Sequence, residues 1–304
     1  MQTVAARPQA PRRRLRFTWA KKQALWGFVF ALPALILFAL FSFIPIARTF
    51  YFSFFRYDML TPATYVGLHN FQSVLSDPTF GQSVVTTVIY VLGTYVPTLA
   101  VALLFALALN MKIKARAFFR TVYFVPVVMS MVVVTVIWRL MFQHYGLINV
   151  TVLNPLHIGT IDWLNSETYA PIGLILMSIW KELGFYIIIF LAGLQNIPSE
   201  YYEAAKVDGA KNLAAFRHIT LPLLQPTILF ASIMAMINGA QIFIPQYVMT
   251  SGGPVNATNV LALNIYQTAF VYLLAGKAAA MSVLLFVFLG IISALQFRFY
   301  RSSQ

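Results

Sequence analysis

The sequence predicts an all-α protein that crosses a membrane six times. Of its 304 residues, 60% are hydrophobic and only 10% are charged, whereas soluble domains carry about a quarter charged residues. Six stretches are apolar and long enough to cross a bilayer as helices, which takes about 20 residues each. Basic residues gather in the segments that join alternate stretches, a pattern that orients membrane proteins. We therefore expect a polytopic membrane protein with no second soluble domain.

The six expected spans are spread along the chain from residue 23 to residue 297. The first is uncharged and too long for a removable signal peptide. The third contains Arg139, and the fourth contains Lys181 and Glu182. The fifth ends ahead of a segment rich in glycine and asparagine, which predicts a loop. The expected bounds are 23–47, 83–109, 119–142, 170–194, 224–245 and 278–297.

If the six helices alternate in direction, sixteen of the 21 basic residues fall on one side of the membrane. These are Arg7, Arg12, Arg13, Arg14, Arg16, Lys21, Lys22, Lys112, Lys114, Arg116, Arg120, Lys206, Lys211, Arg217, Arg298 and Arg301. Because cytoplasmic loops carry an excess of Lys and Arg, we expect both termini in the cytoplasm. Residues 1–22 would then be a basic cytoplasmic tail, which could also bind acidic lipid, and 23–300 would form the transmembrane domain.

The composition argues against catalysis, metal binding and nucleic-acid binding. No cysteine is present, which excludes disulfides and thiolate chemistry. The four histidines, at positions 69, 144, 157 and 218, form none of the spacings of metal or catalytic sites. The basic residues gather beside the spans instead of covering a soluble surface. We expect no catalytic residue, no metal site and no nucleic-acid partner.

The segment 195–223, between the fourth and fifth spans, has a helical pattern of its own. Ser199 can cap a helix, and Glu200 suits the positive end of its dipole. Gly209 breaks this helix because glycine readily adopts positive φ. A second short helix is expected over 210–218, before the Leu-Pro pair at 221–222 starts the next span. Two interpretations follow: an amphipathic hairpin on the membrane surface, or a low-profile surface that another protein approaches.

Several motifs stand at fixed spacing in the chain. Within 195–223 they are Glu203-Ala204-Ala205, Asp208-Gly209-Ala210 and Ile219-Thr220-Leu221-Pro222-Leu223. Shorter ones are YVGLHNF at 65–71, FRTVYFVP at 119–126, IDWL at 161–164, FLAGLQ at 190–195 and TSGGP at 250–254. Together they resemble the permease subunits of binding-protein-dependent ABC transporters, in the sugar-importer branch of the maltose and glycerol-phosphate type. The resemblance covers residues 25–300.

The resemblance implies that the segment 195–223 docks on a separate ATPase. The sequence contains no G-x-x-x-x-G-K-[ST] motif, so ATP and Mg would be bound by that partner and the chain would carry no cofactor. Glu203 would offer a polar or ionic contact, while Ala204, Ala205 and Gly209 would permit close packing. The implied coupling residues are Glu203, Ala204, Ala205, Asp208, Gly209, Ala210, Leu221 and Pro222.

The resemblance also implies that solute passes between the fourth and fifth spans. The implied pathway residues, most of them polar or aromatic as sugar recognition requires, are Ser178, Lys181, Glu182, Phe185, Asn238, Gly239, Gln241 and Ile242. Charged residues at membrane depth are costly and face a cavity or a partner. Lys181 and Glu182 could therefore meet solute or pair with a second permease. Asn238 and Gln241 could alternatively form hydrogen bonds between helices.

We therefore expect a permease subunit of an ATP-driven importer in a bacterial or archaeal plasma membrane, with no enzymatic activity of its own. Its partners would be a second permease, two ATP-binding subunits and an external solute-binding protein. Its solute would be a carbohydrate or a polyol derivative. The alternative is a stand-alone secondary transporter or channel. That class would show inverted repeats and broken helices around an ion site, and neither is evident in the sequence.

Overall fold

The computed structural model describes residues 15–111 and 116–302. The arginines at 7 and 12–14 and the lysines at 112 and 114, which the orientation argument uses, lie outside these ranges. The chain divides into two compact units, Met1–Tyr51 and Phe52–Gln304. We describe each unit by itself.

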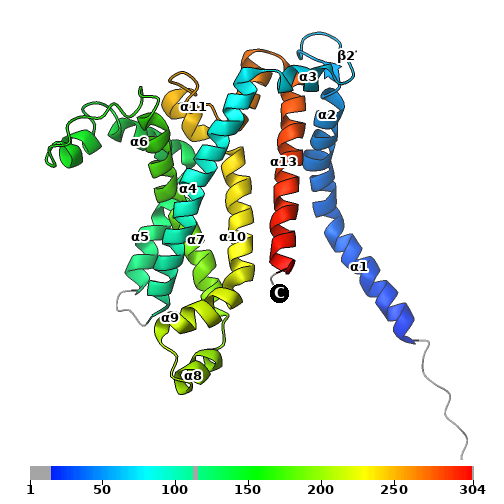
Figure 1. Ribbon diagram of the computed structural model, residues 1–304. Coiled ribbons are helices and arrows are strands. Elements are labelled where there is room, and N and C mark those ends of the chain that lie inside the picture. The colour runs from blue at the N-terminus through cyan, green and yellow to red at the C-terminus, as the bar shows by residue number, and fades with distance from the viewer. Residues whose placement is uncertain (1–14, 112–115, 303–304) are drawn as a thin grey trace, which may run out of the picture. The chain divides into compact units, whose positions relative to one another are not determined.

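The described part of the first unit is a long helical stretch (Figure 1, blue). It consists of α1 (Leu15–Phe38), a π-helical turn η1 (Ala39–Phe43) and α2 (Ile44–Phe52). Proline has no N–H and cannot accommodate the regular helical bond, and the π-helical turn lies directly ahead of Pro45. The resulting candidate span, Lys21–Phe52, extends beyond the expected 23–47 at both ends.

Four long helices form the frame of the second unit (Figure 1). They are α4 (Pro78–Asn110), α7 (Tyr169–Gln195), α10 (Leu221–Gln241) and α13 (Ala275–Ser302). α4 packs along α7, and α10 packs against α4, α7 and α13. The described ranges contain five helices able to cross a membrane by length and composition, or six if a bent pair counts as one. The predicted all-α membrane class is confirmed.

Small residues bring the frame helices close together. Ala102 and Ala106 of α4 are fully buried in the core that α4 shares with α7 and α10. A Cβ on Gly193 of α7 would lie 2.5 Å from the Thr227 hydroxyl oxygen of α10. Such small residues are typical of helix interfaces in membranes, where close packing replaces the hydrophobic effect.

The expected third span, 119–142, is not one straight helix. It consists of α5 (Arg116–Val128) and α6 (Met131–Met141), which meet at an angle of 105°. The helix breaks just after Pro126, and Ser130 is extended. A Cβ on Gly184 of α7 would lie 2.0 Å from the Tyr123 carbonyl oxygen. α5 therefore packs backbone to backbone on α7, and the chain leaves that contact at the bend.

The expected fifth span ends earlier than predicted. α10 ends at Gln241, and Ile242 is extended with φ −73° and ψ 133°. Pro245 instead lies in the first turn of a new helix, α11 (Ile244–Thr250), where its missing N–H does not matter. The apolar sequence 224–245 continues across this break, so its hydropathy alone could not reveal the end of the helix.

The remaining elements precede α4 or lie in the segments that join the frame helices. They are the antiparallel strands β1 (Phe55–Arg56) and β2 (Thr64–Tyr65), and the helices α3 (His69–Leu75), η2 (Ile148–Leu153), α8 (Ser199–Val207), α9 (Asn212–Ala215), η3 (Phe216–Thr220), α12 (Leu261–Tyr266) and η4 (Gln267–Val271). The two short strands are a small addition to the predicted helical fold.

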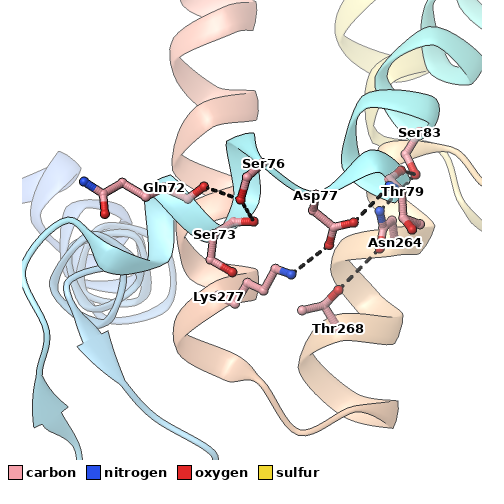
Figure 2. Close-up of polar contacts among 9 residues, drawn as sticks. All are labelled: Gln72, Ser73, Ser76, Asp77, Thr79, Ser83, Asn264, Thr268 and Lys277. Atoms are coloured by element: carbon pink, nitrogen blue, oxygen red, sulfur yellow. Dashed lines mark hydrogen bonds and ion pairs between the residues drawn. The ribbon is translucent and has the colours of Figure 1, made fainter.

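Polar contacts join α4, α12 and α13 (Figure 2) at the end of the bundle away from α8 (Figure 1). The Lys277 ammonium lies 2.7 Å from Asp77, whose other carboxylate oxygen accepts the Thr79 N–H and caps α4. The hydrogen bond from Lys277 lowers the pKa of Asp77 below its ordinary value of 3.8. Nearby, the Asn264 amide donates to the Ser83 hydroxyl over 2.9 Å.

Candidate functional site

The predicted coupling segment, 195–223, begins with α8. Pro198 is extended and precedes the helix, and Ser199 is its first residue without making a side-chain capping bond, so the predicted cap is wrong. Proline before the helix already fixes an extended backbone, which stops the helix from starting earlier. Glu200 lies in the first turn, as predicted.

The turn after α8 has the geometry that the Asp-Gly pair predicts. Gly209 adopts φ +76°. Its N–H donates to the Lys206 carbonyl over 3.1 Å, and the Ala210 N–H donates to the Ala205 carbonyl over 2.8 Å. This pair of bonds is the Schellman motif, in which a left-handed residue satisfies the last carbonyls of a helix. The turn is therefore closed by backbone hydrogen bonds.

The second expected helix, 210–218, does not end at Leu221-Pro222. α9 and η3 continue into α10, so that Asn212–Gln241 is one helical stretch of 30 residues. Pro222 falls in the first turn of α10, directly after the π-helical turn of η3. The wider turn accommodates the missing N–H of proline. The segment is therefore one short helix, α8, beside the beginning of α10.

A hydrogen bond holds α8 on this beginning of α10. The Tyr202 hydroxyl lies 2.9 Å from the hydroxyl oxygen of Thr220, which is itself buried. The predicted coupling residues Glu203, Ala204, Asp208, Gly209, Leu221 and Pro222 are exposed, and Ala205 and Ala210 are half-buried. The apolar side chains of Val207 and Leu213 are 88% and 76% exposed. The segment thus presents a small apolar and acidic surface on a fixed backbone.

Two of the predicted pathway residues on α7 have partners within this chain. Ser178 is buried, and its hydroxyl lies 2.6 Å from the Tyr90 hydroxyl of α4. Lys181 is 7% exposed and donates to the Val127 carbonyl over 3.1 Å. Val127 lies in the last turn of α5, where carbonyls lack helical partners and a cation is favourable. In this structure Lys181 therefore stabilises the end of the bent helix, an arrangement that neither sequence alternative contained.

The next two predicted positions on α7 face the tyrosine residues of the core. Glu182 is half-buried and lies near Tyr90, Tyr95 and Tyr186. Half-buried Phe185 stands edge-on to Tyr186, with ring centroids 5.2 Å apart. A carboxylate beside several phenol groups can bind hydroxyl donors.

The predicted positions on the fifth span divide into two kinds. Asn238 and Gln241 are exposed on α10, and Asn238 lies near the Tyr186 hydroxyl of α7. Gly239 is buried against α4, where a Cβ would lie 2.5 Å from the Tyr95 ring. Ile242 is half-buried at the end of α10. Gly239 and Ile242 therefore shape the backbone, while the polar pair is available for recognition.

Sequence reasoning missed a polar stripe on α4. Its members are Ser83, Thr87, Tyr90, Thr94 and Thr98, and all are buried. Their spacings of three or four residues place them on one face of the helix. The sequence contained a signal for this stripe, because its polar residues recur every three or four positions within an apolar span. Gln246 of α11, which is fully buried, carried no such signal because it lies in a short helix outside the expected spans.

Among the described residues, no group of three or more His, Cys, Asp or Glu side chains could hold a metal ion. The site therefore consists of an exposed helical segment at one end of the bundle and a line of polar side chains through the α4–α7–α10 core. This arrangement can bind a neutral polar solute and receive a mechanical input at α8.

Known proteins resemble the chain over nearly its whole length. A family model described as binding-protein-dependent transport system inner membrane component matches residues 82–302. The chain is 37% identical over 282 residues to the probable ABC transporter permease protein YesP of Bacillus subtilis, covering 91% of both chains. It is 35% identical to the multiple sugar-binding transport system permease protein MsmF of Streptococcus mutans serotype c, covering 90% of this chain and 94% of that one.

Two further similarities concern a sugar permease and a solved fold. The chain is 34% identical to the trehalose/maltose transport system permease protein MalF of Thermococcus litoralis, covering 88% of this chain and 90% of that one. Its fold matches a bacterial ABC transporter involved in import of the acidic polysaccharide alginate, with a TM-score of 0.80 at 21% identity over 94% of this chain and 99% of that one. The chain therefore belongs to the family of binding-protein-dependent transport system inner membrane components, the multi-pass permease subunits of ABC transporters, and is a transport component with no enzymatic role.

Proposed function

We propose that this permease imports a carbohydrate or a polyol derivative. It would form half of a pore with a second permease, served by two ATP-binding subunits, which bind ATP and Mg, and by an external solute-binding protein. The observation that carries the proposal is the set of polar side chains on three packed helices: Tyr90 of α4 bonded to Ser178 of α7, and exposed Asn238 and Gln241 on α10. The sugar-transporter names of the similar permeases support the same solute class.

The coupling segment is proposed to dock in a groove of the ATP-binding subunit. Ala204 and Ala205 would allow a close approach, and Glu203 would supply a polar contact. Because the Schellman turn and the bond from Tyr202 fix α8 against α10, movement of the ATP-binding subunits would reach the membrane helices. Alternating access would follow from that movement.

The proposed orientation places both termini and the segments 112–120 and 195–223 in the cytoplasm, with 1–22 as a basic tail. The chain has no cysteine, so single cysteines can be introduced and treated with an impermeant thiol reagent. Labelling from outside is expected at positions 66 and 160 and not at 114 or 211. Outside labelling at 114 or 211 would overturn the orientation.

The solute pathway is tested with Asn238→Leu and Gln241→Leu in the reconstituted transporter. Both side chains are exposed in this chain, so the changes should leave assembly and basal ATPase activity intact while solute uptake falls. Asn110→Leu provides a control, because Asn110 is an exposed asparagine at the last residue of α4. Normal solute uptake in both variants would contradict the assignment of Asn238 and Gln241 to the solute pathway. Failure of the loaded binding protein to stimulate ATPase activity in the unmodified complex would contradict the importer function itself.

A further inference from the structure

A cavity of about 190 Å³ lies at the end of the bundle opposite α8. It lies between the first half of α4, the beginning of α7, α11 and the loop 257–260. Its polar lining consists of Thr86, Tyr90, Glu167, Gln246 and Thr258. None of these residues belongs to the coupling segment or to the predicted pathway residues.

Gln246 gives this cavity unmet hydrogen-bonding capacity. Its side chain is fully buried, and neither amide atom has a hydrogen-bond partner among the described residues. Buried polar groups are nearly always paired, because burying an amide without a partner is unfavourable. The Gln246 backbone is fixed, since its carbonyl accepts the Thr250 hydroxyl over 2.9 Å. The side-chain amide of Gln246 therefore has a donor and an acceptor, both without a partner, for a hydroxyl group in the cavity.

The floor of the cavity borders the predicted pathway. Tyr90 lines the cavity, and its hydroxyl lies 2.6 Å from that of Ser178 on α7. The Gln246 side chain lies near the same Tyr90 hydroxyl without reaching hydrogen-bonding geometry. A solute group bound to Gln246 would therefore be adjacent to the first pathway residue.

Size and charge indicate what the cavity can hold. Its volume corresponds to about six water molecules and is below the roughly 300–1,000 Å³ of pockets for drug-sized ligands. Apolar side chains, among them Leu174, Ile175 and Val260, form walls that suit the C–H faces of a ring. The exposed carboxylate of Glu167 is the charged side chain in the lining, and it repels anions. One uncharged sugar ring fits the volume, the apolar walls and the negative charge of this cavity.

We propose that this cavity is an outer subsite that holds one uncharged sugar ring before the solute moves to the pathway at Ser178. Gln246 and Tyr90 bind the hydroxyls of that ring, and Glu167 disfavours acidic sugars. The inference rests on the proposed function, whose solute class it narrows. The competing occupant is a cluster of ordered waters, which the following experiment distinguishes.

Gln246→Cys introduces the single thiol of this chain into the cavity. The assembled transporter is treated in proteoliposomes with the cationic 2-aminoethyl or the anionic 2-sulfonatoethyl methanethiosulfonate, and the mass of this chain is followed. We expect labelling, several-fold faster with the cationic reagent, and equal rates after Glu167→Gln. A panel of neutral methyl glycosides (gluco, galacto, manno and xylo) at high concentration should include one that slows the reaction.

A second measurement uses Gln246→Leu, with Gln72→Leu on exposed α3 as the matched control. The protecting glycoside should raise the Tm of the wild-type and control complexes and not that of Gln246→Leu. Absence of labelling, or labelling that no glycoside slows, would overturn the subsite and leave a water-filled cavity. Stimulation of ATPase activity by the loaded binding protein is measured on the same wild-type complex, so failure of the importer function is seen separately.

Discussion

Gly209→Val tests whether the turn after α8 transmits force. Gly209 has φ +76°, and a Cβ there would meet nothing within 4 Å. The effect of a side chain is therefore backbone strain and not a clash. A residue other than glycine costs about 1–2 kcal/mol in the left-handed region, and a β-branched residue costs more. If the backbone relaxes, the two bonds of the turn are lost, at about 0.5–1.5 kcal/mol each.

Either route destabilises the closed turn by about 2 kcal/mol, and every 1.4 kcal/mol is a tenfold change in population. We expect stimulation of ATPase activity by the loaded binding protein to fall by about 30-fold in proteoliposomes if it follows the population of the closed turn. Insertion and basal ATPase activity should remain, because no spanning helix changes. A graded series sharpens the test: Gly209→Asn should be mild because asparagine tolerates positive φ, Gly209→Ala intermediate and Gly209→Val severe.

Gly290→Val is the matched control, because Gly290 of α13 has an ordinary backbone and a Cβ there also meets nothing within 4 Å. Wild-type stimulation in Gly209→Val would refute the reasoning. So would an equal loss in Gly290→Val, since the effect could then not come from the turn.

Three further changes probe other contacts. Tyr202→Phe removes the hydrogen bond between α8 and the start of α10, about 0.5–1.5 kcal/mol, and should reduce ATPase stimulation without reducing insertion. Lys181→Met removes the donor to Val127, about 1.5–3 kcal/mol for a charged bond, and should lower the Tm of the complex while the subunits still co-purify. The bond from Lys277 lowers the pKa of Asp77 below 3.8. The stabilisation of the folded state by this ion pair is therefore complete above pH 3.8 and is lost as the pH falls through the lowered pKa. Asp77→Asn keeps the cap and should lower the free energy of unfolding by up to about 1 kcal/mol above pH 3.8. Below the lowered pKa, the variant and the wild type should unfold at the same concentration of chaotrope.

These changes have controls in the chain. Tyr201→Phe alters an exposed neighbour on α8 and should leave coupling unchanged; an equal effect at both positions would contradict the role of Tyr202. Dissociation of the subunits in Lys181→Met would favour a contact with the second permease. Asp77→Ala removes the cap as well as the ion pair, so it should cost about 0.5–2 kcal/mol more than Asp77→Asn; equal costs would mean that the cap contributes nothing.

The sequence predicted those parts of the fold that depend on apolar length and on glycine. Four expected spans match long helices of the second unit, and the Asp-Gly pair marks the turn after α8. The bend after Pro126 and the end of α10 at Gln241 were missed, because the apolar run continues through both. Whether a proline ends a helix, starts one or follows a π-helical turn depends on the helices packed around it. Hydropathy carries no information about that packing.

The candidate site divides in the same way. The predicted coupling residues lie close together in the chain, between positions 203 and 222, so their placement in one segment followed from the sequence. Tyr90 and Gln246 come from helices far from Ser178 in the chain, and only the packing of α4, α7 and α11 brings them near it. The partner of Lys181 could not be predicted, because the acceptor is a backbone carbonyl that the bend leaves available.

The position of the proposed coupling segment in the chain suits an action of one small helix on the whole proposed pathway. α8 directly follows α7 and directly precedes the stretch that becomes α10, and these two helices carry all of the predicted pathway residues except Ile242, which follows α10. Ser178 precedes the end of α7 by 17 residues, and Asn238 follows the start of α10 by 17 residues. At 1.5 Å per residue both lie about 26 Å from α8, at the same depth. If the closed turn and the bond from Tyr202 transmit a displacement of α8 to both helices, Ser178 and Asn238 would move at one level, as the proposed alternating access requires.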